Sequence, residues 1–153
     1  KPIRLRTRGR NRILREKLLP LATREASLSN GVGGSSGYRL GSVLFYYNNR
    51  RHILDDEERL YVYECGHNSY DTHPLTRFYK YPHMHAETHA ILNRGMIESQ
   101  GCDMLVTRIL KNNKNTMAKP CNSCLALMKE AGIINAYYTN WDGDIECIKV
   151  QDT

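Results

Sequence analysis

The chain has 153 residues, a length typical of one domain with a buried core of its own. No apolar run approaches the roughly 18 residues of a transmembrane helix, which excludes a helical membrane protein. The formal net charge of +6 comes from residues 1–25, where nine Lys or Arg and two Glu give +7.

The N-terminal half is predicted to form a basic arm, a helix and a hairpin. Residues 1–10 should be an extended arm, and apolar residues at helical spacing predict an amphipathic helix over 11–29. Pro20 should kink or divide this helix, because proline lacks the N–H of a regular helical turn. After a Gly/Ser-rich turn, β-branched and aromatic residues predict strands at 39–49 and 59–66, paired as a hairpin.

The second half is predicted to alternate helices and strands after a long polar loop. The expected elements are a loop at 67–84, helices at 85–100 and 121–132, and strands at 103–110, 133–140 and 145–150. Only WDGD separates the last two strands, which is too short for the crossover of a parallel pair, so the last strand should run antiparallel. This order predicts that residues 11–153 form a single α/β sandwich around one mixed sheet.

The cysteines and histidines of two motifs are candidate metal ligands. The chain has five cysteines, and an odd number in a domain large enough to fold without disulfides favours a reducing, cytoplasmic location. Cys121 and Cys124 form a CxxC at the start of a predicted helix, where backbone N–H groups favour thiolates. The other helix opens with HAE at His85. One imidazole and two thiolates would leave a fourth tetrahedral position for water, as in a catalytic zinc site, with Glu87 placed to move that water's proton.

The spacing of these residues matches a known enzyme pattern. H-x-E followed by P-C-x-x-C is typical of zinc-dependent deaminases, and here it spans His85 to Cys124. Over about residues 38–140 the chain resembles the cytidine deaminase superfamily. HAETHAIL resembles the family's HAE helix, while KYPHMHAE and GCDMLV with PCNSCLALMKEAGIINAYY resemble the deoxycytidylate deaminase version.

The resemblance implies both a fold and a site. The implied fold is a three-layer α/β/α sandwich around a five-stranded mixed sheet. His85, Cys121 and Cys124 would bind Zn²⁺, and Glu87 would transfer protons while hydroxide replaces the amino group of the base. Asn68, in CGHNS, corresponds to a residue that contacts the substrate sugar in relatives.

Four further residues are expected to border the substrate. Backbone groups around Ala86 could hold the base edge, and His83 could contact substrate from the loop before the helix. Tyr81 and Tyr138 are expected on loops around the pocket, where they could stack on a base.

Two features depart from the deoxycytidylate deaminase pattern. The segment RILKNNKNTMAK, at 108–119, intervenes before Pro-Cys and should form an extended loop at the pocket. The antiparallel last strand is found instead in nucleoside deaminases and several toxin-type deaminases. The superfamily resemblance is unaffected by either departure.

The function expected from the sequence is therefore a zinc-dependent hydrolase that converts cytosine to uracil in a nucleoside or nucleotide and releases ammonia. One alternative is a deaminase of single-stranded DNA or RNA, favoured by the basic arm and by Lys111 and Lys114. Another is a non-catalytic zinc-fold module that binds nucleic acid, which the presence of Glu87 disfavours.

A closed zinc site completed by His83 has poor ligand spacing, and His89 is expected to be a packed or hydrogen-bonded helix residue. Relatives are commonly homo-oligomers.

Overall fold

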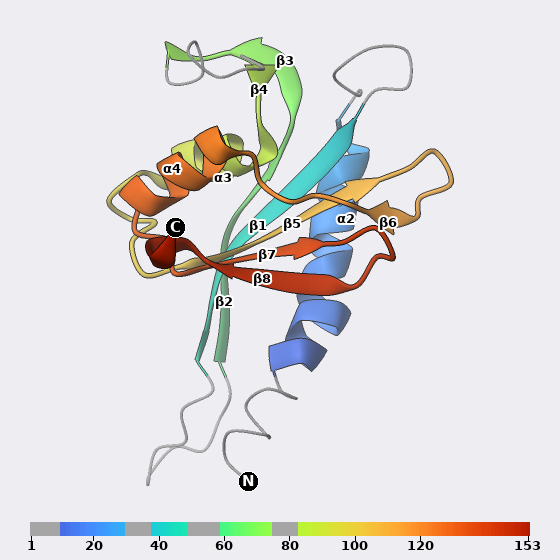
Figure 1. Ribbon diagram of the computed structural model, residues 1–153, viewed down its shortest axis with the longest axis horizontal. Helices are drawn as coiled ribbons and strands as arrows, with labels where there is room; N and C mark the ends of the chain where they lie inside the picture. Colours follow the sequence, from blue (N-terminus) through green and yellow to red (C-terminus); the bar gives the residue numbers. More distant parts are fainter. Residues whose placement is uncertain (1–9, 30–37, 49–58, 75–82) are drawn as a thin grey trace, which may run out of the picture.

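A mixed β-sheet separates two helical layers in the computed structural model, which describes residues 10–29, 38–48, 59–74 and 83–153 (Figure 1). The strand order is β2-β1-β5-β7-β8, and the short β6 pairs with β5. The strands are β1 (Arg39–Asn48), β2 (Arg59–His67), β5 (Asp103–Ile109), β6 (Asn115–Thr116), β7 (Asn135–Thr139) and β8 (Ile145–Lys149). The predicted five-stranded mixed sheet is confirmed, with β6 as an addition.

The directions of the strands follow from the lengths of their connections. β1 is antiparallel to both β2 and β5, whereas β5 and β7 are parallel and are joined through a helix. β8 returns antiparallel to β7, as the short connection between them predicts. In that turn the side chain of Asn140 accepts hydrogen bonds from the backbone N–H groups of Asp142 and Asp144, both at 3.0 Å.

The first helical layer is one continuous helix from residue 10 to residue 27. Its middle is a π-helical segment, η1 (Leu14–Leu18), and it continues as α2 (Leu19–Ser27). Pro20 therefore neither ends nor divides the helix. The wider turn just before it, in which the N–H of Leu19 donates to the carbonyl of Leu14, accommodates a residue that a regular helical turn does not.

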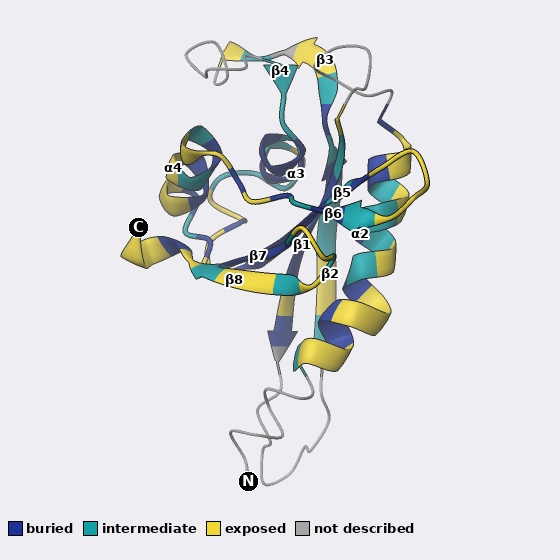
Figure 2. Ribbon diagram, turned by 45° about the vertical axis from the view of Figure 1, so that its right-hand side comes forward, coloured by how far each residue is buried: buried dark blue, intermediate teal, exposed yellow. Residues whose placement is uncertain are grey.

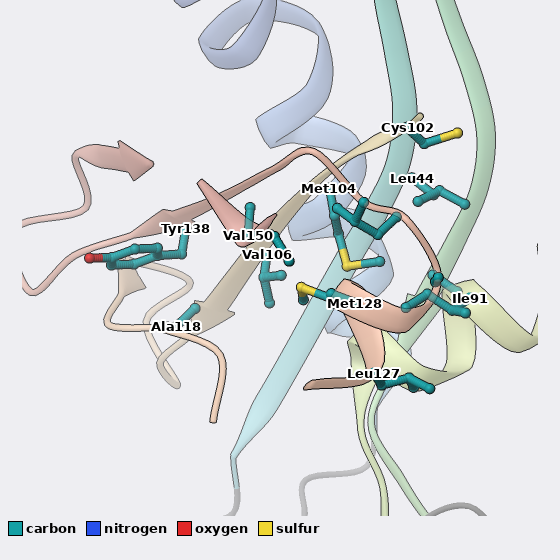
Figure 3. Packing of buried hydrophobic residues seen from close by; sticks show 14 residues of the cluster. Leu44, Ile91, Cys102, Met104, Val106, Ala118, Leu127, Met128, Tyr138 and Val150 are labelled. Atoms are coloured by element: carbon teal, nitrogen blue, oxygen red, sulfur yellow. The ribbon is translucent and has the colours of Figure 1, made fainter. Parts of the chain in front are cut away.

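The second helical layer consists of α3 (Ala86–Arg94) and α4 (Asn122–Glu130) on the opposite face of the sheet (Figure 2). Alternating side chains of each strand divide between the two layers. One face of the sheet packs against α3 and α4, where Leu44, Met104 and Val106 contact Ile91 and Met128 (Figure 3). The other face packs against η1 and α2 and buries Val43, Phe45 and Leu105.

Several elements differ in extent from the sequence prediction. The predicted loop at 67–84 contains a small separate sheet of β3 (Ser69–Thr72) and β4 (His83–Met84). α3 ends at Arg94 rather than just before Gly101, because Gly95 adopts a positive φ of 107°. A short 3₁₀ turn, η3 (Val150–Asp152), follows β8. No described helix is long and apolar enough to cross a bilayer.

The basic N-terminal region contacts the fold where the structure describes it. Residues 1–9 lie outside the described residues, so the extended arm stays a prediction. Arg10 donates to the Tyr137 hydroxyl at 3.1 Å, and Arg15 pairs with Asp144 at 3.2 Å. The side chains of these two arginines therefore make contacts within the molecule.

The close packing of the first helical layer on the sheet requires a glycine at position 41. A Cβ at Gly41 would lie 2.1 Å from the carbonyl oxygen of Ala22 and 2.4 Å from the nitrogen of Ala26, so the α2 backbone itself would have to move. We expect Gly41→Ala to lower the free energy of unfolding by about 2 kcal/mol in urea titrations. Lys17→Ala, an exposed change on the same layer, is the control and should stay within about 0.5 kcal/mol. Equal stability of the two variants would contradict the close approach.

Candidate active site

The N-termini of α3 and α4 meet at one point, and each carries a candidate ligand as its cap. His85 caps α3 with φ −88° and ψ 150°, and Cys121 caps α4 with φ −70° and ψ 165°. Cys124 follows in the first turn of α4. The Nδ1 atom of His85 lies 3.3 Å from Cys124 Sγ and 3.9 Å from Cys121 Sγ.

This donor set fits a zinc ion. The three donor atoms all lie within 4.8 Å of one another. A tetrahedral zinc with the usual imidazole and thiolate bond lengths needs neighbouring donors about 3.5 Å apart, which the two distances to His85 bracket. Within the described residues, His83 is not part of this group, so a closed site with His83 as fourth ligand finds no support.

The two thiols differ in acidity because they share a hydrogen bond. Cys124 donates to Cys121, and together with His85 this contact lowers the pKa of Cys121 to about 4. The same hydrogen bond, together with burial, raises the pKa of Cys124 well above its ordinary value. The contact between the two cysteines thus favours the thiolate at Cys121 and the neutral thiol at Cys124.

Glu87 is a buried carboxyl group beside these ligands. Its residue is only 4% exposed, in the first turn of α3. Burial raises its pKa, and the nearby His85 partly opposes that rise. A carboxyl group whose pKa is moved toward neutrality can both accept and donate a proton during one reaction cycle.

A cavity of about 630 Å³ opens over the site. Its lining includes most of the residues expected from the sequence, namely Asn68, His83, His85, Ala86, Glu87 and Cys121. Cys124 lies deeper and is fully buried. Tyr138 is not in the lining, because its ring packs in the core and its hydroxyl donates to Glu146 at 3.2 Å. Tyr81 lies outside the described residues.

Asn68 and His83 differ in how far their polar atoms are already used. The side chain of Asn68 donates to the Tyr38 carbonyl at 2.7 Å and accepts from the Leu40 N–H at 2.9 Å. It therefore holds the start of β1 in place at the cavity wall. His83 stacks edge-on against Tyr70, and its Nδ1 atom is buried with no hydrogen-bond partner among the described residues.

Ser42 and Gly66 support the site, although neither was singled out from the sequence. The Ser42 hydroxyl, fully buried on β1, donates to the Ala86 carbonyl at 2.8 Å. At Gly66 of β2, a Cβ would lie 2.5 Å from the same carbonyl oxygen. Gly66 of β2, which has no side chain, and the Ser42 hydroxyl of β1 thus position the first turn of α3, which contains Glu87.

His89 belongs to a second polar cluster and has no part in the ligand group at His85. Its Nδ1 accepts the backbone N–H of His67 at 3.1 Å, and His67 Nδ1 lies 2.8 Å from Glu25. This agrees with the expectation that His89 is a hydrogen-bonded helix residue. The cluster links α2, the end of β2 and α3.

Arg108 also lines the cavity. On β5 it follows Met104 and Val106 at spacings of two, so it faces the same side of the sheet as they do. In the sequence, Arg108 could be recognised only as a charged residue on the strand face that also carries two buried apolar residues. That pattern points to a binding role only when the cavity is known.

The ligand assignment predicts the metal content of variants. We expect Cys121→Ser and Cys124→Ser to reduce zinc from about one per chain to under a tenth of that value, as measured by elemental analysis of purified protein. Cys147→Ser is the matched control, since Cys147 lies exposed on β8 outside the ligand group and should leave zinc unchanged. Full zinc stoichiometry in Cys121→Ser would remove Cys121 from the ligand set.

Comparison with known proteins identifies the fold. The cytidine deaminase from Burkholderia pseudomallei superposes with a TM-score of 0.57 and 17% identity, covering 90% of this chain and 94% of that one. The dCMP deaminase from the cyanophage S-TIM5, in apo form, gives a TM-score of 0.49 and 17% identity, with 82% of each chain covered. No protein-family model and no curated protein matches the sequence significantly. The chain therefore has the cytidine deaminase fold.

Proposed function

We propose that this protein is a zinc-dependent hydrolytic deaminase that converts cytosine to uracil in a nucleoside or nucleotide and releases ammonia. The observation that carries the proposal is the position of Glu87, a buried carboxyl group in the same cavity as His85 and Cys121. The sequence pattern of zinc deaminases and the fold support it independently.

The ligands divide the work at the site. His85, Cys121 and Cys124 would hold the zinc ion, which when bound would act as a Lewis acid and lower the pKa of a water molecule to about 7. Among the described residues three ligands converge, and a tetrahedral ion held by three protein ligands would keep its fourth position for water. Glu87 lines the cavity, and its carboxyl group would carry the proton between water and substrate.

Glu87 accounts for the proton transfers of the reaction. It accepts a proton from the attacking water and delivers it to the ring nitrogen next to C4 of cytosine. The water oxygen bonds to C4, and the remaining water proton passes through Glu87 to the amino group, which leaves as ammonia. One water is consumed, and the base keeps its oxygen as the new carbonyl of uracil.

Other residues of the cavity would orient the base. Backbone groups of Ala86, held by Ser42, lie where they could bind the base edge. His83 also lines the cavity, and its Nδ1, which has no hydrogen-bond partner among the described residues, is a second candidate contact for substrate. We assign Tyr138 to the core instead, and a stacking role for Tyr81 stays a prediction.

Deamination of a polynucleotide gains no comparable support. That alternative depended on the basic arm and on Lys111 and Lys114. Within the described residues, Arg10 and Arg15 are used in contacts with Tyr137 and Asp144. Neither lysine lines the cavity.

Glu87→Gln tests the mechanism with the smallest change of shape. We expect this variant to keep about one zinc per chain but to lose ammonia release by a factor of about 10² to 10⁴, because the amide cannot accept and return the proton. The assay panel is cytidine, deoxycytidine, their monophosphates and adenosine, each scored for ammonia. Glu130→Gln, an exposed change on α4, is the control. Undiminished turnover in Glu87→Gln would refute the mechanism, and release from adenosine alone would refute the cytosine assignment.

A further inference from the structure

The cavity over Glu87 contains a cation that the deamination steps do not use. Arg108 lines it from the end of β5, on the face of the sheet that carries α3 and α4. We propose that Arg108 binds the phosphate of the substrate, so that the protein acts on a free cytosine nucleotide in preference to a nucleoside. This inference rests on the proposed deaminase function and names its substrate class.

The guanidinium of Arg108 lacks an ionic partner in the described part of the chain. Its Nε atom is buried without a hydrogen-bond partner there. Two other arginines are engaged differently: Arg39 donates to the Leu110 carbonyl at 2.6 Å, and Arg15 pairs with Asp144. A partly buried cation without a partner is unfavourable, whereas an anionic ligand in the cavity would satisfy it.

Arg108 is held in place by an aromatic ring rather than by a counter-ion. The guanidinium carbon lies 4.0 Å from the centre of the Tyr38 ring. Tyr38 is in turn fixed through its carbonyl, which accepts from the side chain of Asn68. Packing against the ring would orient the planar guanidinium, and an oriented guanidinium can bind phosphate with two parallel hydrogen bonds.

A second cation borders the same cavity. Lys119 stands two residues before Cys121, is exposed and lines the cavity wall. Glu87 is the one carboxylate among the described lining residues, and it lies in the first turn of α3. The cavity therefore combines a carboxyl group for the base with two cations suited to a phosphate.

The size and form of the cavity favour a mononucleotide. A volume of about 630 Å³ falls in the range of sites that enclose small molecules. Single strands are generally bound along an open basic groove with successive stacking platforms. Here the cation lies inside the cavity that also contains Glu87, so base and phosphate of one nucleotide could bind together.

The test is the preference for nucleotide over nucleoside. We expect kcat/KM for CMP or dCMP to exceed that for cytidine or deoxycytidine by at least a hundredfold in the wild type. Arg108→Gln should lower this ratio by about 10- to 100-fold, the range for losing a charge-assisted hydrogen bond. Arg108→Lys should restore part of it. Arg39→Gln, which removes a guanidinium outside the cavity lining, is the control and should keep the ratio.

Specific outcomes would overturn the assignment. A wild-type ratio near one, or a ratio unchanged by Arg108→Gln, would refute the phosphate site while ammonia release from cytidine still supported the deaminase. Faster turnover of single-stranded DNA than of dCMP would refute the assignment of a free nucleotide as the substrate.

If no substrate released ammonia, the proposed function would fail, but calorimetric titration of CMP into zinc-loaded Glu87→Gln would still decide whether Arg108 binds phosphate. A tenfold weaker Kd after adding Arg108→Gln would support it, and an unchanged Kd would refute it.

Discussion

The whole site depends on how closely the first turn of α3 lies on the sheet. That turn contains the candidate ligand His85 as its cap and Glu87 as the second residue of the helix, so a shift of the turn moves both together. Two features of the sheet determine its place: Gly66, where no side chain separates β2 from the Ala86 carbonyl, and the Ser42 hydroxyl, which bonds that same oxygen. A backbone contact of this kind leaves little freedom, which suits a reaction in which a proton must travel between fixed atoms.

The lining of the cavity combines acidic groups with a guanidinium group. Near the ligands, burial favours the neutral form of Glu87, while the hydrogen bond between the cysteines favours a thiolate at Cys121. At the end of β5, the guanidinium of Arg108 lies against the face of the Tyr38 ring. A substrate with a neutral base and an anionic group matches this division, and its charged part would orient the base before any chemistry begins.

Local patterns were sufficient to single out the candidate ligands, but the residues that support the site depend on long-range pairing. His85, Glu87, Cys121 and Cys124 stand out because each motif lies within one helical turn. Ser42 and Arg108 have no such local signal, since their roles depend on β1 lying between β2 and β5 and on α3 crossing that sheet. Pro20 shows a different limit of prediction from sequence. Its lack of an N–H indicates an irregular helix, but either a break or a π-helical turn can accommodate such a residue.

The polar cluster of Glu25, His67 and His89 has a consequence for solubility. β2 is an edge strand, and edge strands with free N–H groups can pair with strands of other molecules and begin aggregation. His89 accepts the N–H of His67 from the side, so the last residue of this strand has no donor to offer a neighbouring chain. At the other edge, β8 carries the exposed Glu146 and Lys149, whose charges discourage the same event. The helix that contains Glu87 thus also shields one end of an exposed sheet edge.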